Sequence, residues 1–170
     1  LISSYWSTQT RIYTYYVTVS DTALSFATEQ TRTLSTGITN AGICLKKLSA
    51  TNYIISFGKT GFVAAIGMTL SGGTVTYGTQ NDFVVATTPR LTVQSLVALT
   101  STTAFLAYVV GSVAPYTLFG VVLTITGTTI TAGTPVSLDN TGNDLGPVYA
   151  FSQNGSVVAI SNIIAAATRA

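Results

Sequence analysis

Two aspartates stand close together in the segment DNTGND, Asp139 to Asp144, and the chain has only five acidic side chains in all. Paired carboxylates can act as general acid and base in hydrolysis, and clustered oxygen ligands can bind calcium. The segment lacks the loop length and terminal glutamate of an EF-hand, and no nucleophile motif or phosphate-binding loop accompanies it. We therefore predict an Asx-rich turn at this segment, with no catalytic and no metal site.

The chain contains no histidine, and Cys44 is its single cysteine. The usual general base and the usual zinc ligand are therefore missing. One cysteine can form neither an intrachain disulfide nor a tetrathiolate zinc site. Cys44 stands next to Leu45, and we predict that it is a small buried apolar residue. These features favour a protein that is not an enzyme and that binds no cofactor.

Aromatic side chains are the remaining candidates for ligand binding. Trp6, Tyr13, Tyr15 and Tyr16 cluster near the start of the chain, and such rings can stack on the apolar faces of sugars. Tyr13 and Tyr15 fall on one face of a predicted strand, which favours packing in the core. Trp6 and Tyr116 are the aromatic residues that packing explains least. We predict that these two bind a ligand, either a glycan or a cell-surface receptor.

Charge and hydropathy limit the class of partner. Charged residues make up only 7% of the 170 residues, and seven basic against five acidic side chains give a formal net charge of +2. The basic residues are scattered, which argues against nucleic acid as a partner. Apolar runs such as GFVAAIGM fall short of the roughly 18 residues of a membrane helix, so we predict no membrane insertion. A hydrophobic content of 47% with few charges favours a subunit of a protein assembly, most simply a homo-oligomer.

The elements that must position these residues repeat along the chain. Leu48 to Phe57, LSATNYIISF, matches Leu99 to Tyr108, LTSTTAFLAY, at an offset of 51 residues, and Phe151 to Ile160 at a further 52. Thr69 to Thr79 matches Thr124 to Thr134 at an offset of 55. Big, small and polar positions agree in these segments. We infer structural units of about 50 residues, a period typical of repeat architectures.

Each unit contains a predicted hairpin. The reversals fall at Ser20-Asp21, Ser71-Gly72 and Thr126-Gly127, and hairpin turns require residues that tolerate positive φ, as glycine and aspartate do. After each turn, apolar residues alternate with serine or threonine. This period of two predicts an outer strand with one buried and one exposed face.

A second type of strand is apolar on both faces. The segments Tyr53 to Phe57, Ala104 to Val110 and Val157 to Ile160 show this pattern. Such strands are covered on both sides, as inner strands of stacked sheets are. Phe57 and its counterpart Tyr108 are predicted to occupy the same core position.

Together these patterns predict an all-β fold of repeated four-stranded antiparallel units, similar to the blades of a β-propeller. In the best-defined unit the strands lie near Leu45 to Leu48, Tyr53 to Phe57, Val63 to Leu70 and Thr74 to Thr79. We divide the single domain 1–170 into a half unit 1–41, units 42–94 and 95–144, and a half unit 145–170. The half units sum to a third unit, which leaves a threefold β-trefoil or β-prism as an alternative. The polar start without methionine favours a segment of a longer chain.

The run FLAYVVGSVAPYTLFGVVLTITGTTITAGTPVSL, Phe105 to Leu138, resembles the propeller repeats of bacteriophage tail-fibre and appendage proteins and of some bacterial surface proteins. These repeats have an apolar strand ending in Tyr, a Gly-bearing loop, a second apolar strand, and then Gly-Thr-Thr-Ile. Other units depart from this form, with Gly73 in place of Thr128, and Asp21 in place of glycine.

The resemblance implies a non-enzymatic structural or adhesive module of a virion or cell-surface assembly, extracellular and in contact with host receptors. The alternative is a lectin-like carbohydrate-binding domain of β-trefoil or β-prism type, suggested by the sum of three units and by the aromatic side chains.

Overall fold

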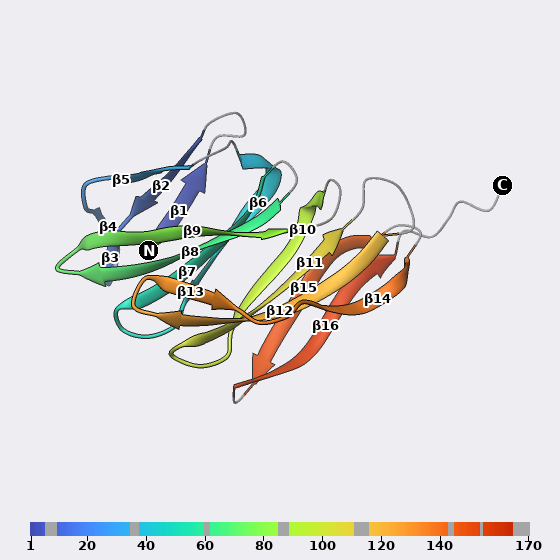
Figure 1. Cartoon of the computed structure of the whole chain (residues 1–170). Helices are drawn as coiled ribbons and strands as arrows, with labels where there is room; N and C mark the ends of the chain where they lie inside the picture. The colour runs from blue at the N-terminus through green and yellow to red at the C-terminus, as the bar shows by residue number, and fades with distance from the viewer. Residues whose placement is uncertain are drawn as a thin grey trace.

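A computed structural model describes residues 1–5, 10–34, 38–59, 62–84, 89–110, 116–142, 145–153 and 155–164. Every regular element in these ranges is a β-strand, and all strand pairs are antiparallel (Figure 1). None of the sheets formed by these described strands closes on itself. The predicted all-β class is confirmed.

Two sheets form the centre of the molecule. The first is a four-stranded meander of β6 (Ile38–Lys47), β7 (Asn52–Lys59), β8 (Phe62–Ser71) and β9 (Thr74–Val84). The second contains β10 (Pro89–Ala98), β11 (Thr103–Val110), β12 (Tyr116–Thr126), β13 (Thr129–Ala132) and β14 (Val136–Gly142). β13 pairs with one half of β12 and β14 with the other half, so the two short strands together occupy the position of one edge strand. The five-stranded sheet is therefore four strands wide, like the first sheet.

Smaller sheets flank the two central ones. On the N-terminal side lie a sheet of β1 (Ile2–Tyr5), β2 (Arg11–Tyr15) and β5 (Gln30–Thr33), and a hairpin of β3 (Val17–Ser20) and β4 (Ala23–Phe26). On the C-terminal side lies a hairpin of β15 (Leu145–Gln153) and β16 (Ser156–Ile164). Figure 1 shows the sheets following one another across the molecule in chain order.

The sheets stack face to face, with the same strands in contact at each interface. The first strands of successive sheets are neighbours, β6 beside β10 and β10 beside β15. At the opposite edge, β13 contacts β8 and β9, and β5 contacts β9. Between these two edges, each interface buries a layer of apolar side chains.

Three hydrophobic clusters fill these layers. The cluster between the N-terminal sheet and the β6–β9 sheet includes Ile12, Ile55, Phe57, Ile66 and Met68. The cluster between the two central sheets includes Ile54, Leu106, Tyr108, Leu123 and Ile125. A third, with Phe105, Ala107, Val109 and Leu118, packs against Ala150 of β15.

β7 and β11 belong to two clusters each, because successive side chains of a strand point to opposite faces. Ile54 and Ile55 pack in different clusters, as do Phe105 and Leu106. The predicted burial of these two strands on both faces is confirmed, as is the burial of Phe57 and Tyr108. The third predicted segment, residues 157–160, forms part of β16, and its side chains lie outside the described residues.

The predicted turns also carry the backbone conformation that we expected. The φ angles are 41° at Asp21, 55° at Gly72 and 60° at Gly127. The φ angle of Gly73 is also positive, at 81°, so the turn between β8 and β9 has the two positive φ values that a type I′ hairpin requires.

The loops before β7 and β11 share one hydrogen-bond pattern. The Ser49 hydroxyl accepts a bond of 3.0 Å from the Asn52 backbone N–H, and the Thr100 hydroxyl accepts one of 3.0 Å from the Thr103 N–H. These residues stand 51 positions apart in the sequence. The two loops therefore have the same local chemistry at the offset at which the sequence repeats.

Candidate functional site

The structure does not bring the two predicted binding residues together. Trp6 lies outside the described residues. Tyr116 begins β12, where its backbone is opposite Gly142 of β14, and its side chain lies outside the described residues. Ligand binding by Trp6 and Tyr116 therefore stays a prediction.

The predicted Asx-rich turn is partly wrong. Asp139 to Gly142 belong to strand β14, with Asp139 opposite Leu118 of β12, and Asp144 lies outside the described residues. Pairing with the long strand β12 extends this polar segment. Among the described residues, no group of three or more His, Cys, Asp or Glu is placed to hold a metal ion.

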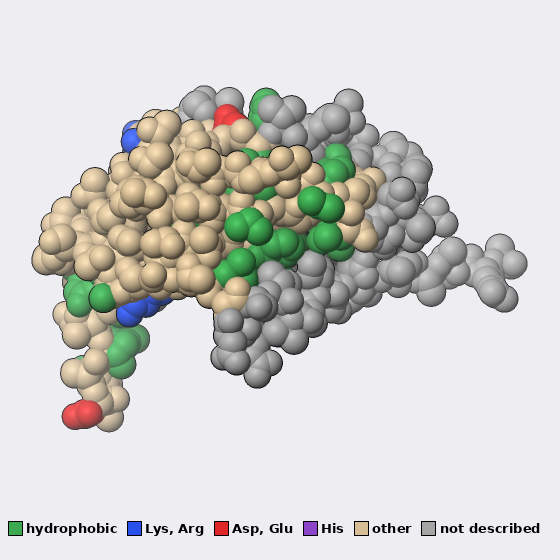
Figure 2. All heavy atoms as spheres, turned by 60° about the horizontal axis from the view of Figure 1, so that its bottom comes forward, with side chains coloured by type: hydrophobic (Ala, Val, Ile, Leu, Met, Phe, Trp, Pro, Cys, Tyr) green, Lys and Arg blue, Asp and Glu red, His purple; other side chains and the backbone are tan. Residues whose placement is uncertain are grey.

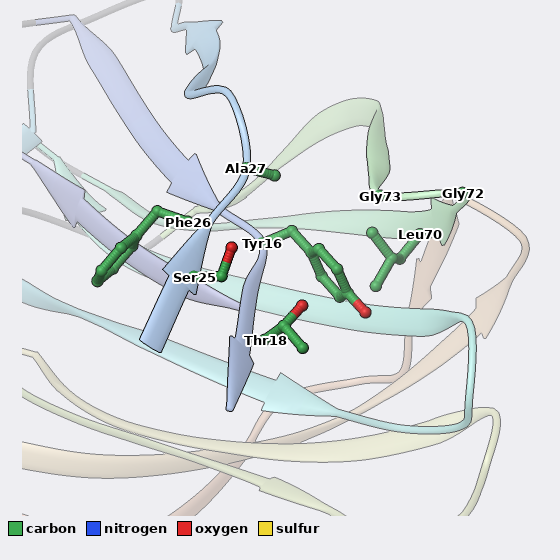
Figure 3. Close-up of a pocket in the computed structure, with 8 residues that line it drawn as sticks. All are labelled: Tyr16, Thr18, Ser25, Phe26, Ala27, Leu70, Gly72 and Gly73. Carbon is green, nitrogen blue, oxygen red and sulfur yellow. The ribbon is translucent and has the colours of Figure 1, made fainter. Parts of the chain in front are cut away.

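A shallow pocket of about 530 Å³ lies between the β3–β4 hairpin and the turn that joins β8 to β9 (Figure 3). Its lining includes Tyr16, Thr18, Ser25, Leu70, Gly72 and Gly73. The hairpin stands out from the body of the molecule (Figure 2), and the pocket lies in the angle between the hairpin and the body.

The hairpin presents a ring and two hydroxyl groups to this pocket. Thr18 and Ser25 are directly opposite one another in the β3–β4 register, so both side chains lie on one face. Figure 3 shows the Tyr16 ring extending over Thr18 toward Leu70, while Phe26 points the other way. Among the described residues that line the pocket there is no carboxylate, amino or imidazole group. The pocket therefore offers a ligand one aromatic ring and two hydroxyl groups.

Gln30 of β5 fixes the far wall of the pocket. Its amide nitrogen donates a 3.1 Å hydrogen bond to the Gly73 carbonyl, and its amide oxygen accepts a 2.7 Å bond from the Val75 N–H. The Tyr77 hydroxyl donates to the Gln30 carbonyl at 3.2 Å. Three bonds thus hold the β8–β9 turn against the N-terminal sheet.

An ion pair between a buried lysine and a partly exposed aspartate lies at the far end of β7, away from the pocket. Lys59 is 2% exposed, and its Nζ is 2.6 Å from Asp82 Oδ2 of β9 and 5.1 Å from the centre of the Phe62 ring. Gln80 donates a 2.7 Å hydrogen bond to Asp82 Oδ1. The pair joins two strands of one sheet, which indicates a structural role.

Cys44 lies on β6 opposite Ser56 and packs against the cluster between the central sheets. Burial raises the pKa of its thiol, although the Leu96 backbone, Lys46 and Ser56 oppose this rise. A raised pKa reduces the thiolate fraction, so the thiol is a poor nucleophile. The prediction of a packing role agrees with this partly buried position.

Sequence reasoning missed the position of Tyr16 at the pocket. It placed Tyr16 in an aromatic cluster but did not separate it from its neighbours. The available signal was the alternation of Tyr16 with Thr18, opposite Ser25, which gives one hairpin face a ring and two hydroxyls.

Sequence reasoning also predicted a buried face for the strand that follows Asp21, and this was wrong. Leu24 and Phe26 are 62% and 61% exposed, and all of β4 is exposed. No described strand covers the apolar face of this hairpin.

Comparisons with known proteins give no family for the chain: no family model matches it, nor does any curated protein or solved structure. Among the described residues, no helix is long and apolar enough to cross a membrane.

Proposed function

We propose that this chain is a structural and adhesive module of an extracellular assembly, a virion fibre or a cell-surface appendage, built from propeller-like units stacked face to face. The observation that carries the proposal is that apolar side chains are exposed on two separate surfaces of the molecule. Val19, Leu24 and Phe26 are exposed on the N-terminal hairpin, and Val122, Val136 and Leu138 on the β10–β14 sheet. Exposed apolar surface marks sites of protein association.

The recurrence of contacts between sheets supports the propeller-like part of the proposal. Ser95 of β10 accepts a 3.0 Å hydrogen bond from the Ala150 N–H of β15. Cys44, 51 residues earlier, receives a backbone hydrogen bond from Leu96 of β10. At both interfaces, a side chain on the first strand of one sheet thus accepts a hydrogen bond from a backbone N–H on the first strand of the next sheet. A unit that buries its faces against copies of itself makes such contacts at every interface.

The location of the chain tests this proposal. Antibodies raised against the folded 170-residue chain should label intact particles or unpermeabilised cells in the material from which the sequence derives. An antibody to a cytoplasmic protein serves as the control for integrity. Labelling that appears only after lysis contradicts the proposal.

Glycan binding in the hairpin pocket is a second candidate function, favoured by the Tyr16 ring beside the Thr18 and Ser25 hydroxyls. An aromatic face stacks on the apolar face of a sugar, and hydroxyl groups replace the hydrogen bonds that the sugar makes with water. This candidate keeps the adhesive role but assigns it to a different region from Trp6 and Tyr116.

Tyr16→Ala should weaken glycan binding about tenfold, because the loss of one stacked ring costs about 1–1.5 kcal/mol. A glycan array identifies a ligand, and titration calorimetry then gives its Kd for each variant. Leu24→Ala is the matched control, since Leu24 lies on the other face of the same hairpin. Equal binding by the two variants would place any glycan site elsewhere.

A further inference from the structure

Three hairpins in this chain carry an apolar pair at the same place. The pairs directly opposite in the strand register, two positions beyond the turn, are Val19 with Leu24, Leu70 with Val75, and Ile125 with Ile130. Val75 is 6% exposed, and Ile125 and Ile130 are 0% and 5% exposed. In contrast, Val19 and Leu24 are 71% and 62% exposed.

The buried pairs show what this hairpin face does. Val75 packs in the cluster with Ile12 of the N-terminal sheet, and Ile125 and Ile130 pack in the cluster with Ile54 of the β6–β9 sheet. In both cases the hairpin lays its apolar face on the sheet that comes earlier in the chain. We name the exposed equivalent, formed by Val19, Leu24 and Phe26, the head face.

The sheet surface on which such a hairpin packs also has an exposed equivalent. On the β6–β9 sheet, the next sheet approaches so closely that a Cβ on Gly67 or Gly78 would lie 2.6 or 2.0 Å from the Thr128 carbonyl oxygen. Gly133, 55 residues after Gly78, lies in the segment between β13 and β14, and a Cβ there would meet only the Val122 carbonyl oxygen, at 3.3 Å. No described turn covers this second position.

Apolar side chains are also exposed on the same sheet. Val122, Val136 and Leu138 are 45%, 59% and 44% exposed, and we name them the tail face. A Cβ on Gly120 would lie 2.6 Å from the Phe105 ring and 2.9 Å from Leu138, so the tail face continues the cluster that packs against β15. Figure 2 shows exposed hydrophobic side chains both on the projecting hairpin and across the middle of the body.

We infer that the head face of one copy of this chain docks on the tail face of a second copy. The inference rests on the proposed function and names the partner and the two surfaces. Its basis is continuity: at two internal interfaces a hairpin of this chain already packs its apolar face on the preceding sheet, and the described residues leave the head face and the tail face exposed. Such head-to-tail contacts use two different surfaces, so they build rings or filaments rather than a closed symmetric dimer.

Two substitutions test the two faces independently. Leu24→Asp places a charge on the head face and Val136→Asp places one on the tail face, both at exposed positions where the fold of the monomer does not depend on the side chain. Ala50→Asp, at an exposed loop position between β6 and β7, is the control. Circular dichroism should show the same strand content for all of them.

Sedimentation velocity over a range of concentrations gives the result. The native chain and Ala50→Asp should self-associate, and each face variant alone should associate at least tenfold more weakly. An equimolar mixture of the two face variants should form a one-to-one complex, because each supplies the face that the other has lost. That complex distinguishes head-to-tail docking from a head-to-head contact, in which Val136→Asp alone would still dimerise.

A native chain that stays monomeric at all concentrations overturns the inference, as does a mixture that forms no complex. Surface labelling by antibody is independent of this result. Positive labelling with a monomeric chain therefore overturns the docking and leaves the proposed function standing.

Discussion

Gly78→Ala should lower the free energy of unfolding by about 3 kcal/mol, at the upper end of what overpacking a buried contact costs. A Cβ at this position would lie 2.0 Å from the Thr128 carbonyl oxygen and 2.8 Å from its carbonyl carbon. Both atoms belong to the backbone, so no side chain can rotate to relieve the clash. The turn that carries Thr128 must therefore move away from the β6–β9 sheet, which opens the apolar layer between the two central sheets.

The same substitution at Gly133 is a matched control. Gly133 stands 55 residues after Gly78, and its Cβ would approach only the Val122 carbonyl oxygen, at 3.3 Å. Alanine restricts the unfolded chain more than glycine does, which offsets a mild contact of this kind. Gly133→Ala should therefore change the free energy of unfolding by no more than about 0.5 kcal/mol.

Urea denaturation of both variants measures the difference. Equal stability of Gly78→Ala and Gly133→Ala would mean that the two central sheets do not approach each other at Thr128. Gly67→Ala, at which the Cβ would lie 2.6 Å from the same oxygen, provides a second measurement on a neighbouring strand.

Sequence could predict the features that depend on local conformation. The turns at Asp21, Gly72 and Gly127 were predictable because positive φ restricts the choice of residue. The burial of β7 and β11 on both faces was predictable because it leaves apolar side chains at every position.

Sequence could not predict which faces are covered, because that depends on a neighbouring sheet. Leu24 and Val75 follow their turns in the same alternating pattern, yet Val75 is 6% exposed and Leu24 is 62% exposed. The reason is that the β8–β9 hairpin has an earlier sheet to pack on, whereas no described strand lies beyond the β3–β4 hairpin. Periodicity defines a face and carries no information about its partner.

The candidate site was hidden for a related reason. The pocket brings Tyr16 close to Leu70 and Gly73, more than 50 residues away, and no local pattern indicates that approach. Asp139 was misread because its polar neighbours resemble a turn, whereas pairing with β12 across Leu118 makes them a strand. In both cases a long-range contact overrode the local preference.

Asp82→Ala should lower the free energy of unfolding by about 3 kcal/mol, because it removes the carboxylate that compensates a buried ammonium. Lys59 is 2% exposed, and its Nζ is 2.6 Å from Asp82. Without that carboxylate the buried ammonium loses an ionic contact of 2.6 Å, and its charge favours opening of this end of the sheet to water. The Phe62 ring, 5.1 Å from Lys59 Nζ, offers a weaker attraction than the carboxylate does.

Lys59→Met should be far milder than Asp82→Ala, within about 1 kcal/mol of the native chain, although both break the same ion pair. Methionine fills a similar volume beside Phe62 and needs no charged partner, while Asp82 is 35% exposed and can be hydrated once Lys59 is gone. Thermal and urea denaturation of the single variants and of the double variant complete a double-mutant cycle. We expect the double variant to match Lys59→Met. If Lys59→Met instead costs as much as Asp82→Ala, the ion pair itself stabilises this end of the sheet, and the argument from the buried charge fails.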